Sequence, residues 1–167
     1  MGAINSAFNQ AAGAIAGSAL AIKHAKQTDE SKMNVAEHSA LVARNQARDA
    51  EAEYDKAKAE NEFITDENGK TNSLIASSFI ANRKLNEAEA AFDEVKNLKN
   101  TSPKTVEKKL NDLMAAKSAA DALNAKLDAI DNMRTRAIEQ RAYADKANQL
   151  AEREQQRYKS KWEWGGK

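Results

Sequence analysis

The side chains that could do chemistry in this chain of 167 residues are scattered along it. His24 and His38 are the only histidines, and neither has a second imidazole one helical turn away. Transition metals need several such ligands converging on one point. The chain also has no cysteine, which excludes thiolate nucleophiles, thiolate metal sites and disulfides. We therefore predict no metal site.

Carboxylates are plentiful, and a close pair of them is the usual equipment for general acid and base catalysis. Their densest group, within residues 46–62, alternates with basic residues, which is typical of a solvated helix face with ion pairs between successive turns. The sequence holds no glycine-rich phosphate loop, G-x-S-x-G, H-E-x-x-H or EF-hand loop. We predict no catalytic residue, no cofactor and no enzymatic activity.

The aromatic residues near the carboxyl end are better suited to binding. Trp162 and Trp164 are the only tryptophans, and Tyr158 lies one helical turn before them. Tryptophan buries a large area with few rotatable bonds, which favours it at interfaces. We predict that these three side chains dock on a partner or on a second copy. Packing on the chain's own helices and contact with a membrane surface are the alternatives.

The amino-terminal segment, residues 1–22, carries no charged side chain. It contains a G-x-x-x-G pair, and small residues four apart let two helix backbones approach closely, in membranes or in proteins. Its apolar run is shorter than the roughly 20 residues that span a bilayer, and no basic region precedes it as in a signal peptide. The predicted contacts, by close protein packing or with a membrane, are Gly13, Ile15, Gly17, Leu20 and Ile22.

The elements that position these groups are helices, because about half of the chain is Ala, Glu, Lys, Leu and Arg. A row of small and apolar residues at alternating steps of three and four runs from Phe8 to Ala57, and only Lys26 and Asp29 in it are charged. This spacing predicts one long helix made of the segments 1–22 and 23–62.

Two turns delimit the remaining helices. The segment 63–73 contains Asn68-Gly69 among Asp, Thr and Ser, which predicts a turn followed by a shorter helix over 74–99. A second turn at 100–103 ends in Ser102-Pro103, a helix cap and a first helical residue. We predict a second long helix over 104–160 and a tail over 161–167.

Alanine dominates these rows, and only 26 residues are Leu, Ile, Val or Phe, fewer than a compact domain usually needs. Alanine lets helices approach closely but buries little area. We therefore predict an all-α, elongated helical hairpin or coiled coil of two long helices and one shorter helix, completed as a homo-oligomer. The predicted oligomer seam is Ala36, Ala40, Ala43, Ala47, Ala50, Tyr54, Ala57, Leu123, Leu127 and Ile130.

The net charge of +1 argues against a protein whose main task is to grip nucleic acid through its phosphates. Of the 22 Asn and Gln residues, many are spread along the two long helices. Neutral amides would let a polyanion pass without trapping it, although we favour the simpler interpretation that they are ordinary exposed polar residues. Any contact with DNA is therefore expected to be independent of its sequence.

The layout of the first 62 residues resembles two kinds of phage virion protein. The uncharged segment MGAINSAFNQAAGAIAGSALAI precedes the long helix KMNVAEHSALVARNQARDAEAEYDKAKAENEF. This order is similar to the small inner-core ejection protein of short-tailed phages and to the DNA pilot protein of tailless icosahedral phages. The resemblance implies a helical subunit of a ring or tube, whose apolar amino end meets the host membrane during genome delivery.

We expect from this resemblance a structural protein of the virion that contacts other virion proteins of the portal, tail or core. Two alternatives remain open. One is a cytosolic coiled-coil scaffold or adaptor without a membrane role, for which residues 1–22 would be dispensable. The other is a helical pore-forming protein, which would make lipid vesicles leak by itself.

Overall fold

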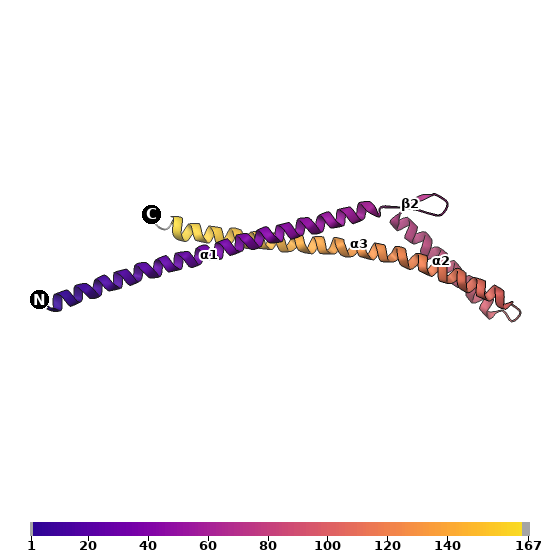
Figure 1. Cartoon of the computed structure of the whole chain (residues 1–167), viewed down its shortest axis with the longest axis horizontal. Coiled ribbons are helices and arrows are strands. Elements are labelled where there is room, and N and C mark those ends of the chain that lie inside the picture. The colour runs from indigo at the N-terminus through magenta and orange to yellow at the C-terminus, as the bar shows by residue number, and fades with distance from the viewer. Residues whose placement is uncertain (1, 165–167) are drawn as a thin grey trace. The chain divides into compact units, whose positions relative to one another are not determined.

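The computed structural model describes residues 2–164, with side chains from 17 to 163. In this range the chain forms helices α1 (Gly2–Glu60), α2 (Leu74–Asn97) and α3 (Pro103–Tyr158), which continues into a π-helical turn, η1 (Lys159–Trp164) (Figure 1). Strands β1 (Phe63–Thr65) and β2 (Thr71–Ser73) stand between α1 and α2. The prediction of an all-α protein with two long helices and one shorter helix is confirmed.

The segment between α1 and α2 is a β-hairpin, where the sequence predicted only a turn. Ile64 pairs with Asn72 and Thr65 with Thr71 in antiparallel register. At its tip Gly69 has a φ of 78°, in the left-handed region that favours glycine. Asp66 Oδ1 accepts hydrogen bonds from the backbone N–H groups of Asn68 (2.9 Å) and Lys70 (2.8 Å). Strands of three residues leave too little alternation for sequence reasoning to detect.

Serine caps begin α2 and α3. Ser73 Oγ accepts a hydrogen bond from the backbone N–H of Ala76 at 3.1 Å, and Ser102 Oγ accepts one from that of Thr105 at 3.3 Å. Pro103 is the first residue of α3, a position where its missing N–H leaves no helical hydrogen bond unmade. These caps fix where both helices begin.

The chain divides into two compact units. The terminal unit comprises residues 1–48 and 139–167, and the central unit comprises residues 49–138. In the terminal unit, α1 and α3 pack through alanine: Ala43, Ala47 and Ala144 form a buried cluster, with Ala147 packed against it. Side chains this small bring two helix backbones close together.

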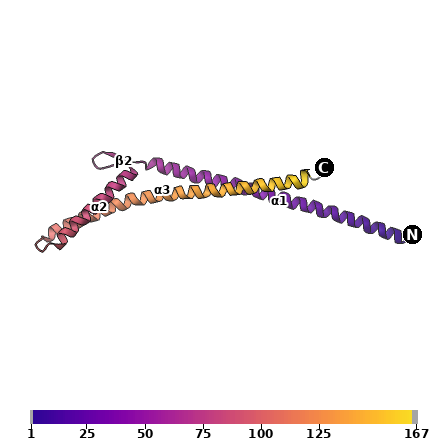
Figure 2. The same ribbon diagram turned by 180° about the vertical axis from the view of Figure 1, so that it is seen from behind.

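The central unit packs α2 against the first part of α3 (Figure 2). Its buried residues include Leu74, Ser78 and Ala81 of α2 and Ala120 of α3. Ser78 Oγ donates to Asn124 Oδ1 (2.7 Å), and Asn82 and Asn124 exchange hydrogen bonds between their amides (3.2 and 3.1 Å). Polar groups paired in this way between two helices fix their register, because a shifted register would leave them unpaired.

Candidate functional site

In the terminal unit, α1 extends past the end of η1 (Figure 1). Every residue from 17 to 24 is exposed, a segment that we call the uncovered stretch. Leu20 is 68% exposed and Ile22 59%, and a Cβ added to Gly17 would meet nothing within 4 Å. The side chains of Gly13 and Ile15 lie outside the described residues. The covered part of α1 begins with the half-buried Ala25 and Asp29.

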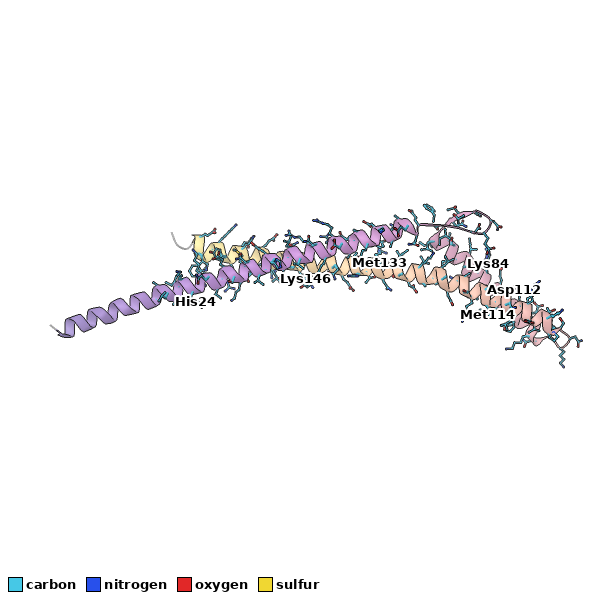
Figure 3. The ribbon with its side chains drawn as sticks, viewed as in Figure 1. His24, Lys84, Asp112, Met114, Met133 and Lys146 are labelled. Atoms are coloured by element: carbon cyan, nitrogen blue, oxygen red, sulfur yellow. The ribbon has the colours of Figure 1, made fainter. Side chains whose placement is uncertain are left out.

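The uncovered stretch is a neutral surface as far as Ile22, before the cation Lys23. No side chain from Gly2 to Ile22 is charged, and the first titratable groups are Lys23 and His24, the latter at the end of the exposed stretch (Figure 3). A neutral helix with two exposed aliphatic side chains is suited to another neutral helix or to a lipid surface. Among the described residues, no helix combines the length and the hydrophobicity needed to cross a bilayer.

A charged cluster marks the point where the carboxyl-terminal turn meets α1. Asp29 Oδ2 accepts hydrogen bonds from Lys161 Nζ at 2.9 Å and from the indole Nε1 of Trp162 at 3.0 Å. The Asp29 side chain is only 14% exposed, and Lys161 Nζ lies 5.0 Å from the centroid of the Trp162 ring. The distance suits a cation–π interaction between the two donors.

The π-helical turn explains how consecutive residues reach one carboxylate. A π-helix takes more residues per turn than an α-helix, so adjacent side chains point in more similar directions. Lys161 and Trp162 both lie in η1, directly after α3 ends at Tyr158. The widened turn thus brings an ammonium and an indole N–H to the same oxygen.

The two donors stabilise the charged form of Asp29. The hydrogen bond from Lys161, and then the one from Trp162, hold the pKa of the Asp29 carboxyl below its ordinary value, and the charges of Lys161 and Arg157 act in the same direction. Desolvation opposes them without reversing the shift. At neutral pH the cluster therefore contains an ionised carboxylate.

Every residue of the predicted oligomer seam is buried or half-buried within the single chain. In the terminal unit Ala40, Ala43 and Ala47 are buried, the last two against Ala144 of α3, and Ala36 is half-buried. In this part of the seam, Ala43 and Ala47 are therefore covered by α3 of the same chain. In the central unit Ala50 is buried, and half-buried side chains complete the set: Tyr54, Ala57, Leu123, Leu127 and Ile130.

A groove of ≈ 300 Å³ in the central unit gathers three of the predicted seam residues. Tyr54, Leu127 and Ile130 line it together with Leu74 and Ile75 of α2. Ile75 is 73% exposed, and Phe79, one turn along α2, is 70% exposed. The apolar side chains on this part of α2 are thus open to solvent.

Of the three aromatic residues predicted to dock on a partner, the structure describes the side chains of two, and both are half-buried in the chain itself. Trp162 is half-buried and bonded to α1 of its own chain, which is the packing alternative that the sequence left open. Tyr158 is half-buried as well, and the side chain of Trp164 lies outside the described residues. His24 and His38 are exposed, and no group of three or more potential metal ligands occurs in the described part of the chain.

Sequence reasoning did not single out Asp29 as a site residue. The signal was present, because Asp29 is one of two charged residues in the otherwise neutral row from Phe8 to Ala57. A charge at a position that faces a neighbouring helix needs a partner there. Its partners lie more than 130 residues further along the chain, so that no local pattern could identify them.

Comparisons of the chain with protein families, with curated proteins and with solved structures found no match.

Proposed function

We propose that this chain is a non-catalytic structural subunit of a phage virion, which forms or lines a helical ring or tube used in genome delivery. The observation that carries the proposal is that α1 continues past the turn that ends the paired helices, and that no side chain from Gly2 to Ile22 is charged. A helix with this neutral extension is suited to contact a membrane or a neighbouring subunit.

The length of the extension supports a role at a membrane. Residues 2–24 of α1 measure about 35 Å at 1.5 Å per residue, close to the ~30 Å of a bilayer's hydrocarbon core. Polar residues within this segment make a single copy a poor membrane span. Several copies side by side would turn these polar groups toward one another and their aliphatic groups toward lipid.

The partners follow from the same proposal. Other proteins of the portal, tail or core would hold the paired helices, and the host membrane would meet residues 1–22. DNA would pass the near-neutral helices without sequence-specific contacts, since few excess basic charges are available to release counterions. The place of the chain would then be the virion.

Vesicle flotation tests the membrane contact. We expect the full chain to float with anionic vesicles, and the double variant Leu20→Asp, Ile22→Asp to remain in solution. Val35→Asp, compared with each single variant, Leu20→Asp and Ile22→Asp, is the control for one added charge, because Val35 is an exposed aliphatic residue of α1 (65%) outside the uncovered stretch. Flotation that persists in the double variant would contradict a contact through residues 1–22.

Mass spectrometry of purified phage particles tests the location. Recovery of the chain from particles is expected, in a ratio to the portal protein that gives the copy number. Recovery from particle-free cytosol, together with normal assembly after deletion of residues 1–22, would instead favour the scaffold. The exposed Ile75 and Phe79 of α2 would then be its first candidate contacts.

A further inference from the structure

The carboxyl-terminal turn meets α1 at the boundary between its exposed and its covered part. Asp29 lies on α1 five residues after His24, the last residue of the uncovered stretch. Lys161 and Trp162 reach it from η1, the last described turn of the chain. The cluster therefore sets how much of α1 is left exposed.

Apolar packing between α1 and α3 is weak in the region between the alanine cluster and Asp29. Between Asp29 and Ala40 no residue of α1 is buried. Val35 and Leu150 are 65% and 56% exposed, and they line an open groove of ≈ 470 Å³ together with Thr28, Ser31 and Glu154. Since side chains this exposed gain little from burial, they bind the end of α3 to α1 only weakly.

Polar contacts bind the end of α3 to α1 instead. Gln155 Nε2 donates a hydrogen bond to Glu37 Oε1, and the bonds from Lys161 and Trp162 of η1 to Asp29 follow further along the chain. Both donors of the cluster share a single oxygen of Asp29. Loss of that one charge would weaken both bonds together, because each gains strength from an ionised acceptor.

We propose that the η1 turn is a latch closed by the charge of Asp29. When the latch is closed, Trp162 lies on α1 and the exposed part of the helix ends before Ala25. When it is open, Trp162 is free to bind elsewhere, and the exposed part extends toward Glu37. The latch goes beyond the function proposed above and does not depend on it, since it concerns contacts within one chain.

The charged groups around Asp29 define the conditions that open the latch. Arg157 of α3 and Lys161 of η1 face it from the carboxyl-terminal side, while Lys26, Glu30 and Lys32 are its nearest charged neighbours along α1. High salt weakens the attraction between these groups, and protonation of the carboxylate removes it. A cation or a partner group that binds Asp29 would act in the same way.

Tryptophan fluorescence of the full chain tests the latch. In a Trp164→Phe background, Trp162 is the only tryptophan. Adding Asp29→Asn should move its emission to longer wavelength, increase its quenching by acrylamide and speed amide exchange over residues 155–163. The matched control is Glu30→Gln, which removes the same charge from an exposed neighbour and should leave all three readouts at the values of the background.

Two results would overturn the latch: emission and exchange that Asp29→Asn leaves unchanged, or an equal change caused by Glu30→Gln. If Asp29→Asn reduces the helix content, a second pair of variants tests the same contact through its η1 residues. Lys161→Met should release Trp162, whereas Lys159→Met, at an exposed lysine of the same turn, should not. Combining Asp29→Asn with Lys161→Met should add little to either change, because both remove one interaction.

Discussion

In the terminal unit, alanine side chains make the buried cluster between α1 and α3, whereas in the central unit a hydrogen-bonded set of Ser78, Asn82 and Asn124 lies between α2 and α3. Alanine permits close packing but distinguishes poorly between registers, since one small side chain replaces another. Amides and hydroxyls specify one register, because shifting it would leave them without partners. The comparison indicates that register is encoded in the central unit and that the terminal unit needs another device, which the Asp29 cluster supplies.

The largest effect is expected from a charge placed in the alanine cluster. Ala144→Asp should lower the free energy of unfolding by roughly 3 kcal/mol, because it puts an unpaired carboxylate at a position that is fully covered. Thermal unfolding followed by circular dichroism measures the loss. Ala142→Asp, two residues earlier on the exposed face, controls for helix propensity. Equal losses in both variants would contradict tight packing at Ala144.

A somewhat smaller effect is expected in the central unit. Asn124→Ala should lower the free energy of unfolding by about 2 kcal/mol, because Ser78 and Asn82 lose their shared partner in a half-buried place. Denaturant unfolding measures the change, with the exposed Asn132→Ala of the same helix as control. If Asn124→Ala were as stable as the control, the amides would not determine how α2 and α3 align.

Replacing either of two glycines by alanine should have opposite effects on the structure. Gly69→Ala should destabilise the central unit by about 1 kcal/mol, since its φ of 78° disfavours a side chain. Gly17→Ala should raise the helix content of α1, because alanine is the better helix former by about 1 kcal/mol and open space surrounds the site. Circular dichroism measures both. A Gly17→Ala variant that keeps its helix but no longer binds vesicles would assign Gly17 to that contact.

The smallest effect is expected from pH at the Asp29 cluster of the terminal unit. The pKa of Asp29 is lowered from 3.8, so its cluster stabilises the fold above that value and loses this contribution as the pH falls through the lowered pKa. Emission of Trp162 in the Trp164→Phe background should be constant from neutral pH down to about 4 and shift only below it. In Asp29→Asn the same titration should lack that shift.

Much of the fold could be predicted from the sequence, because helix periodicity and caps are local signals. The row through Ala40, Ala43 and Ala47 identified the face that is buried, and Ser102-Pro103 identified the start of α3. At 63–73 the sequence predicts only a turn, because the strands of the hairpin are three residues long. For Trp162 the sequence predicts docking on a partner, with packing on the chain's own helices as an alternative, and in the structure Trp162 bonds to Asp29 of its own chain. The sequence cannot decide between the two, because tryptophan suits an interface and a chain's own helix equally.

The sequence by itself determined the helices, their ends and the neutral amino-terminal extension, since each depends on residues within a few turns of one another. Only the tertiary structure decided which surfaces meet: that Ala47 is covered by α3 of the same chain, and that Asp29 receives Lys161 and Trp162. The physical reason is that alanine rows and single charges are compatible with many partners. Which partner they take depends on how the chain brings distant segments together.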